Sequence, residues 1–197
     1  MEDYPKEVRL KDGKKVKIRL MSGEDREEFR RFFLGLSEQD RMFLKEDFSS
    51  EEALNELIHS ISTGSIQPIV AESEGKIVGY ALLNRYKFSW LRHVGEIRIA
   101  VAKAYRKRGL GTYLAKEVFH TALKEGLQKI LAEMMADQVD AIRMFEKLGF
   151  QKEAILKDHV IDLKNTSHDL LIMSQHLDIL WRKVEDMIIA EEQRSQD

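Results

Sequence analysis

A strand pattern, a basic turn with two glycines and a helix pattern follow one another between residues 94 and 125. The stretch "VGEIRIAVA" predicts a strand, and apolar residues recur every fourth position from Leu110, as along a buried helix face. Gly126 is expected to end that helix. A strand that leads through a turn into a helix exposes the first N–H groups of the helix, so this segment is suited to bind an anion.

Strand patterns also occur on both sides of this segment. Near the N-terminus, two strand pieces are expected on either side of a two-residue turn at Asp12-Gly13. Two more strands, at 66–73 and 76–86, are expected to be joined by a turn at Glu74-Gly75. Further strands are expected at 128–136, 150–163 and 168–174.

Helix patterns alternate with these strands. Helices are expected to begin at Ser22 with Asp25, at Ser49 with Glu52, and at Asp137, and the last of them to stop at Gly149. The first two would bury helical stripes of Phe29, Phe32, Phe33 and Leu36, and of Leu54, Leu57, Ile58 and Ile61. The alternation predicts an α/β or α+β domain built on a sheet.

Composition and charge limit the classes of partner. The 197 residues include 32 basic and 34 acidic side chains, and the net charge of −2 argues against general affinity for nucleic acid or membranes. Any anion site must therefore be local. No cysteine occurs, which excludes disulfides and thiolate metal sites, and the polar N-terminus does not resemble a signal peptide. No apolar run approaches the ~20 residues of a membrane span, and we expect a cytoplasmic protein.

The pattern changes near the C-terminus. We expect one domain over residues 1–175, followed by an amphipathic helix and a frayed tail at 176–197. The apolar stripe of that helix consists of Leu177, Leu180, Trp181, Val184 and Ile188. The stripe would pack either on the chain's own domain or on a second subunit, so a homodimer is one of two open interpretations.

The turn "RKRGLGT", residues 106–112, gathers three cations, two glycines and a threonine. Glycines let the backbone approach a phosphate without a Cβ in the way, and the cations add to the positive field at the start of the helix. The spacing matches neither the P-loop nor the dinucleotide-binding fingerprint. Two interpretations stay open on these residues alone: a phosphate-binding loop, or a solvated basic turn before a helix.

Two stretches together carry a family resemblance. "VAKAYRKRGLGTYLAKEV" resembles the acetyl-coenzyme A (acetyl-CoA) loop of the GNAT superfamily of N-acetyltransferases, and "AIRMFEKLGF" at 141–150 resembles its second signature. Within the superfamily the chain is most similar in look to bacterial protein-lysine acetyltransferases. The resemblance implies a mixed, mostly antiparallel sheet with splayed central strands, flanked by helices. It also implies an acyltransferase that moves an acetyl group from acetyl-CoA to a primary amine, on a protein lysine or a small molecule.

The resemblance also implies where the cofactor binds. Backbone N–H groups of residues 106–111 would hold its pyrophosphate, and the backbone of residues 99–101 would pair with its pantetheine arm and polarise the thioester carbonyl. The implied cofactor-binding residues are Ile99, Ala100, Val101, Arg106, Lys107, Arg108, Gly109, Leu110, Gly111, Thr112 and Phe145.

Acetyl transfer to an amine requires a group that removes a proton, because a lysine amine with a pKa of ~10.4 is protonated at neutral pH. Glu96 is the first candidate, since the lysine acetyltransferases that the chain resembles carry a catalytic glutamate at the matching place. Its alternative role is a surface glutamate paired with Arg98 or another neighbour. Glu133 is the second candidate, with an ordinary exposed strand position as its alternative.

The chain departs from the family pattern at two positions. Phe145 stands where many relatives have a tyrosine that protonates the leaving thiolate, and Gln138 stands where an asparagine is usual. The acid therefore stays unassigned, as does the acceptor. These departures keep open a domain that binds acetyl-CoA as a sensor without turnover. A scaffold or nucleic-acid protein is disfavoured by the charge and the second signature, and the scattered histidines do not indicate a metal site.

Overall fold

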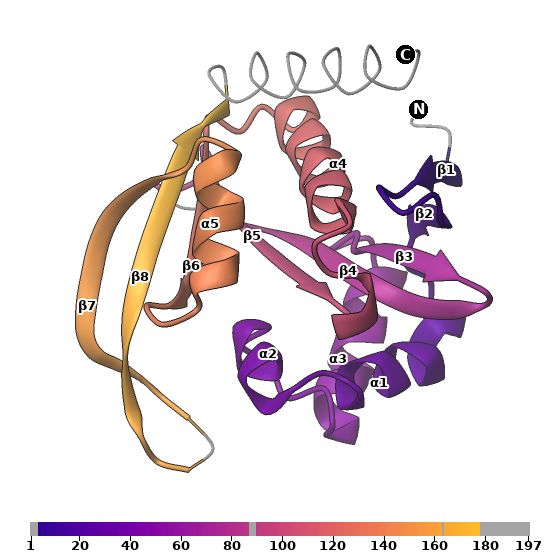
Figure 1. The fold of residues 1–197 in the computed structure, drawn as a ribbon, viewed down its shortest axis with the longest axis horizontal. Helices are drawn as coiled ribbons and strands as arrows, with labels where there is room; N and C mark the ends of the chain where they lie inside the picture. The colour runs from indigo at the N-terminus through magenta and orange to yellow at the C-terminus, as the bar shows by residue number, and fades with distance from the viewer. Residues whose placement is uncertain (1–3, 87–89, 163, 178–197) are drawn as a thin grey trace. The chain divides into compact units, whose positions relative to one another are not determined.

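The computed structural model describes residues 4–86, 90–162 and 164–177, and Figure 1 gives the course of the chain. One mixed, mostly antiparallel sheet contains eight strands in the order β1-β2-β3-β4-β5-β6-β8-β7, which confirms the predicted class. The residues divide into two compact units, of which the first comprises 1–84 with 97–118 and the second 85–96 with 119–197. Every helix in the described part of the chain is too short or too polar to span a bilayer.

The elements follow the predicted alternation. In the first half of the chain they are β1 (Lys6–Arg9), β2 (Lys15–Leu20), the 3-10 helix η1 (Gly23–Asp25), α1 (Arg26–Leu34), α2 (Glu38–Phe43), α3 (Glu51–Ser62), β3 (Ile69–Ser73) and β4 (Lys76–Arg85). The remaining elements are β5 (Val94–Val101), the 3-10 helix η2 (Lys103–Tyr105), α4 (Leu110–Lys124), β6 (Lys129–Met135), α5 (Val139–Lys147), β7 (Gln151–Ile161) and β8 (Ser167–His176). The sequence did not predict α2.

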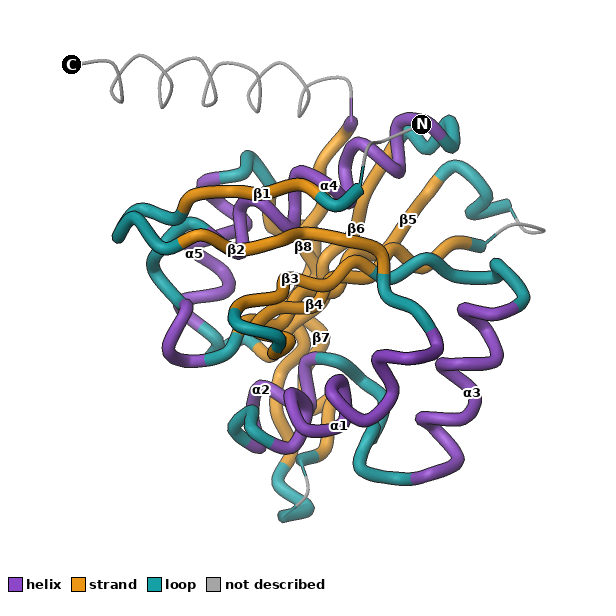
Figure 2. The backbone as a smooth tube through the Cα atoms, turned by 90° about the vertical axis from the view of Figure 1, so that its right-hand side faces the viewer, coloured by secondary structure: helices purple, strands orange, loops and turns teal. Residues whose placement is uncertain are grey.

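Two hairpins begin the sheet of the first unit, and Figure 2 shows β1 to β4 side by side. Glu74 and Gly75 both have positive φ, 53° and 73°, so they form the predicted two-residue turn between β3 and β4. The predicted two-residue turn at Asp12-Gly13 is wrong. The ladder of β1 and β2 ends at Arg9, and the loop that follows contains five residues, 10–14. Hydrogen bonds from its own amides stabilise this longer loop.

The predicted helix starts are partly correct. Ser22 and Asp25 form the expected capping box. The next long helix is capped by Ser50, whose Oγ accepts from Ala53 N at 3.1 Å, because the predicted cap, Ser49, instead donates to Asp47.

At helix α5, the observed start differs from the predicted one by one residue, whereas the observed end agrees with the prediction. Gln138, rather than the predicted Asp137, occupies the N-cap position of α5. Gly149, with a φ of 91°, follows that helix as predicted, since a glycine adopts this left-handed conformation without a Cβ clash.

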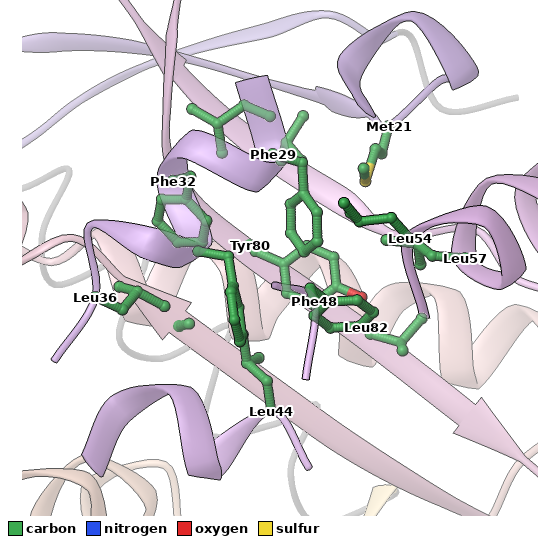
Figure 3. Close-up of a cluster of buried hydrophobic side chains, with 14 residues drawn as sticks. Met21, Phe29, Phe32, Leu36, Leu44, Phe48, Leu54, Leu57, Tyr80 and Leu82 are labelled. Carbon is green, nitrogen blue, oxygen red and sulfur yellow. The ribbon is translucent and has the colours of Figure 1, made fainter. Parts of the chain in front are cut away.

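The core of the first unit lies between the sheet and helices α1 and α3. Figure 3 shows Tyr80 of β4 beside Phe29 of α1, with ring centroids 4.8 Å apart, and Phe48 packs on the same phenylalanine. Both predicted stripes face this core: the phenylalanines of α1, Leu54 and Leu57 are buried. Packing of an amphipathic face on a sheet supplies most of the stability of such short helices.

Helix α4 packs on the opposite face of the same sheet. Gly79 is adjacent to Tyr80 in β4 and therefore faces the other way. A Cβ at Gly79 would lie 2.9 Å from Cδ1 of Leu114 and 3.4 Å from Cδ2 of Leu110, so the glycine allows the start of α4 to approach the strand closely. This contact places the N-terminus of α4 relative to β4.

The second unit is built on β6, β7 and β8, with β5 joined by three parallel residue pairs that end at Glu96 and Leu131. This short parallel ladder is what a splay of the central strands predicts. Helix α5 packs on β6 (Figure 1), and Phe145 of that helix is fully buried against Phe150. Leu177 is buried, whereas the rest of the predicted C-terminal helix lies outside the described residues.

Candidate functional site

The basic turn connects β5 to α4 within the first unit. The 3-10 helix η2 follows Val101, and a short loop then leads to Leu110, where α4 begins. Two residues of that loop have left-handed backbone conformations: Lys107 has a φ of 60° and Gly109 a φ of 92°. The value at Gly109 favours glycine strongly, since a Cβ is strained in that region.

The loop presents backbone amides at the helix start. The amides of Thr112 and Tyr113 both donate to the carbonyl oxygen of Gly109, at 3.0 and 3.1 Å. Among the described residues, no backbone hydrogen bond engages the amides of residues 108–111. These donors sit at the positive end of the α4 dipole, so the local chemistry fits an anionic phosphate group.

The two arginines of the turn have partners within the protein. Arg106 donates from Nε to the carbonyl oxygen of Val101 at 2.9 Å, and its Nη2 lies 2.6 Å from Oδ2 of Asp40 in α2. Arg108 forms an ion pair with Asp12 of the β1–β2 loop. These carboxylates offset positive charge that the sequence assigned to an incoming phosphate, so the backbone amides of the turn become the more direct candidates for binding it.

The β1–β2 loop braces the basic turn. Lys11 donates its amide to the carbonyl oxygen of Arg108 at 3.1 Å, and the Tyr113 hydroxyl donates to the carbonyl oxygen of Arg9 at 3.3 Å. Lys14 contacts Tyr105, the last residue of η2. Burial by itself would raise the pKa of the Tyr105 phenol, but hydrogen bonds with Lys14 and Ser73 outweigh burial and lower that pKa.

The first strand is also attached to α4 itself. Glu117 of α4 is buried and accepts from the Tyr4 hydroxyl at 2.8 Å and from Lys6 Nζ at 2.7 Å. Burial, together with the Glu117 carboxylate, raises the pKa of the Tyr4 phenol. The β1–β2 hairpin is thus attached at several points to the basic turn and to α4, the two elements that would hold a cofactor.

The two candidate bases lie in the second unit. Glu96 is only 5% exposed, so the interpretation of Glu96 as a surface residue is wrong. It is paired with Leu131 in the parallel ladder, and Glu133 stands two residues further along β6. Because side chains alternate along a strand, Glu96 and Glu133 point to the same face of the sheet, about 7 Å apart along the strand direction. Glu133 is half-buried rather than fully exposed.

A buried arginine that the sequence did not single out lies on β5 in the first unit. Arg98 is 8% exposed and donates from Nη1 to the carbonyl oxygen of Leu44 at 2.9 Å and to the Glu46 carboxylate. With the Asn84 amide oriented so that its oxygen faces the guanidinium, that oxygen accepts from Nη2 at 3.0 Å. Arg98 thereby fixes the segment after α2, and the suggested pairing with Glu96 is not needed to explain its burial.

Phe145 is packed as a core residue. It is fully buried, and its ring centroid lies 5.0 Å from that of Phe150 in an edge-on arrangement. Its expected contact with the cofactor stays a prediction. Within the described residues, no group of three or more histidine, aspartate or glutamate side chains could hold a metal ion.

The family model described as the acetyltransferase (GNAT) family matches residues 26–150. The chain is 30% identical over 103 residues to an N-alpha-acetyltransferase of Sulfurisphaera tokodaii, which is 47% of this chain and 61% of that protein. The chain spans less than two thirds of the length of the curated relatives it matches.

Solved structures share the fold. The GNAT domain of S. lividans PAT has a TM-score of 0.73 at 15% identity, over 89% of this chain and 98% of that one. The structure of yncA from Salmonella typhimurium with its cofactor acetyl-CoA has a TM-score of 0.65 at 21% identity, over 82% of this chain and 94% of that one. At these identities the likeness shows the fold alone. The family match covers more than half of the residues, and the chain therefore belongs to the GNAT acetyltransferase family.

Proposed function

We propose that the protein is an N-acetyltransferase that moves an acetyl group from acetyl-CoA to a primary amine by direct attack on the thioester. The observation that carries the proposal is the turn at 106–112, where backbone amides without backbone partners in the described chain lie at the N-terminus of α4. An anion of the size of a phosphate fits donors arranged in this way. Family membership supports acetyl-CoA as the ligand that supplies the phosphate.

The chain's own backbone would hold the cofactor in two places. Amides of residues 108–111 would bind the pyrophosphate, and the end of β5, at Ile99 to Val101, would pair with the pantetheine arm. The bound cofactor supplies an activated acetyl thioester. The yncA structure, which holds acetyl-CoA, supports this choice of ligand at the level of the fold.

Glu96 would accept the proton that the acceptor ammonium must lose before its nitrogen can attack. A carboxylate held in a buried position has a fixed orientation, which favours proton transfer directly or through one water. Glu133 lies on the same face and is the second candidate for this role. The acceptor would be a protein lysine or a small-molecule amine.

No proton donor for the leaving thiolate is assigned, because Phe145 carries no acidic proton. A thiol with an ordinary pKa of ~8.5 leaves as a thiolate that water can protonate. The same substitution favours the second candidate function, a domain that binds acetyl-CoA as a sensor without turnover.

The test is release of free thiol from acetyl-CoA against a panel of small amines, peptides with free N-termini and lysine-containing proteins. Acceptor-dependent release is the expected result, and the active acceptors would define the substrate class. Calorimetric binding of acetyl-CoA without release for any acceptor would instead support the sensor.

A further inference from the structure

Apolar side chains border the two candidate bases on their face of the second unit. Leu131 of β6 is directly opposite Glu96 in the parallel ladder, and Ile172 of β8 is directly opposite Glu133. Residues directly opposite each other in neighbouring strands point to the same face of a sheet, and the strands are about 5 Å apart. An aliphatic side chain therefore stands next to each carboxylate.

The apolar surface continues across the sheet, in which β6, β8 and β7 are neighbours (Figure 1). Ala154 of β7 is opposite Ile172, and Leu156 is opposite Leu170. Since side chains alternate along each strand, these residues share the face of Glu133. We call them, together with Leu131, the apolar strip.

The two faces of this part of the sheet differ in exposure. On the opposite face, four side chains are only 0–2% exposed: Ala132, Met134, Leu171 and Met173. Within the apolar strip, Leu131, Leu156 and Ile172 are half-buried and Ala154 is exposed. Accessible apolar surface around a few fixed polar groups is the usual composition of a ligand-binding site, so the strip is suited to contact a substrate.

Charged side chains at the two ends of the strip are paired within the protein. At one end Lys129 Nζ lies 2.8 Å from Oε1 of Glu153, and at the other His168 Nε2 lies 3.0 Å from Oδ2 of Asp162. Both candidate bases also interact within the protein. A second charge on the acceptor would lose water beside hydrocarbon and meet charges that already have partners, which is unfavourable. The strip therefore fits an uncharged hydrocarbon group.

From this arrangement we propose that the acceptor carries an apolar group next to its amine, and that Ile172 and Leu131 bind this group. Two strand spacings separate Glu133 from Ala154, about 10 Å, which corresponds to an alkyl chain of about six carbons. The inference rests on the proposed function, because it names the class of amine that the enzyme acetylates. An alkyl or aryl amine and the methylene stem of a lysine side chain share this chemistry.

The test compares two acceptors that differ in polarity and match in size. Hexylamine and 3-ethoxypropylamine have equal numbers of non-hydrogen atoms, and the second has an ether oxygen in place of one methylene. Thiol release from acetyl-CoA by the whole chain gives kcat/KM for each amine. The ratio of the two values is compared between each variant and the wild type, so the difference in amine basicity cancels.

We expect the wild type to prefer hexylamine about tenfold, because the ether oxygen loses water on binding. Ile172→Thr keeps a β-branched side chain but removes hydrocarbon, and it is expected to reduce this preference about threefold. Ala154→Leu adds hydrocarbon at an exposed position and is expected to increase the preference about twofold.

The matched control is Ile155→Thr, since Ile155 is 53% exposed and points to the opposite face of β7. This variant is expected to keep the wild-type ratio. Thermal unfolding of each variant verifies that the sheet remains folded, and Ala154→Leu tests the strip even where Ile172→Thr fails to fold.

Nα-acetyl-lysinamide separates the two sources of an apolar group. A kcat/KM close to that of hexylamine assigns the group to a lysine stem, and a much lower value assigns it to a small amine. Transfer to amines without preference for hexylamine, or an unchanged ratio in both Ile172→Thr and Ala154→Leu, would overturn the role of the strip and leave the proposed function intact. Failure to acetylate any amine, polar or apolar, would contradict the proposed function and the inference with it.

Discussion

Arg106 donates from Nε to the carbonyl oxygen of Val101 at 2.9 Å, so the first residue of the basic turn is bonded to the last residue of β5. The same guanidinium pairs with Asp40 of α2. Arg106 is therefore a residue that shapes the turn, and its charge is shared with a carboxylate of the protein. The loop conformation, more than its count of cations, would determine how well the amides face a phosphate.

Arg106→Lys is expected to weaken acetyl-CoA binding about tenfold while keeping the charge, because lysine has no planar fork that reaches Val101 and Asp40 together. Asp40→Asn keeps the bond to Val101 and is expected to have a smaller effect. Calorimetric titration of both variants measures the difference. Wild-type affinity in Arg106→Lys would show that this side chain does not shape the turn.

Gly109→Ala is expected to lower the free energy of unfolding by about 1–2 kcal/mol, because alanine is strained at a left-handed φ. Gly64→Ala is the matched control, since Gly64 has a φ of 68° and open space around it, away from the turn. Both variants should lose stability in chemical unfolding. Only Gly109→Ala should also lose affinity for acetyl-CoA, and equal affinities in the two variants would count against the turn as the binding site.

Glu96→Gln is expected to lower kcat about 10²–10⁴-fold, the usual contribution of a general base, with unchanged affinity for acetyl-CoA. Raising the pH should restore much of the activity, because the acceptor amine then loses its proton to solvent near its own pKa of ~10.4. Glu133→Gln is the control and should retain activity within about tenfold. A larger loss in Glu133→Gln than in Glu96→Gln would reverse the two assignments.

Asp25 links stability to pH. Burial by itself would raise the pKa of its carboxyl, but Arg19, at 2.7 and 2.8 Å, and the Ser22 amide outweigh burial and hold that pKa below its usual range. Since the folded-state pKa is the lower one, the carboxylate stabilises the fold above the unfolded pKa of ~3.9. That contribution is lost as the pH falls through the folded value.

Asp25→Asn should therefore lower the free energy of unfolding at neutral pH by about 1–3 kcal/mol and show less further loss at acidic pH than the wild type. Glu24→Gln, at the adjacent exposed position, should leave both quantities near wild type. Urea unfolding across the acidic range provides the measurement. Parallel pH curves for wild type and Asp25→Asn would contradict the linkage.

Local patterns predicted the helical stripes, the turn at Glu74-Gly75 and the glycines that end two helices. Each of these depends on side chains or dihedral preferences within a few residues. The N-caps lie at Ser50 and Gln138, each one residue after the predicted position. At the first of these, the hydroxyl of the predicted cap Ser49 bonds to Asp47 instead.

The partners of the basic turn could not be predicted in the same way. Asp12 and Asp40 meet the arginines only because the sheet and α2 bring distant segments to the turn. The burial of Glu96 likewise follows from packing on both sides of β5, which strand alternation alone does not reveal. The roles of the site residues stay predictions until the variants above are measured.

The most direct test of the central claim is the identity of the acetylated product. Wild-type protein is incubated with acetyl-CoA and an amine acceptor. The amount of acetylated acceptor, measured by mass spectrometry, is compared with the amount of free thiol released. The account predicts one acetyl group on the acceptor nitrogen for each thiol released, with both strongly reduced in Glu96→Gln. Cofactor binding with no acetylated amine, for any acceptor tested, would contradict it.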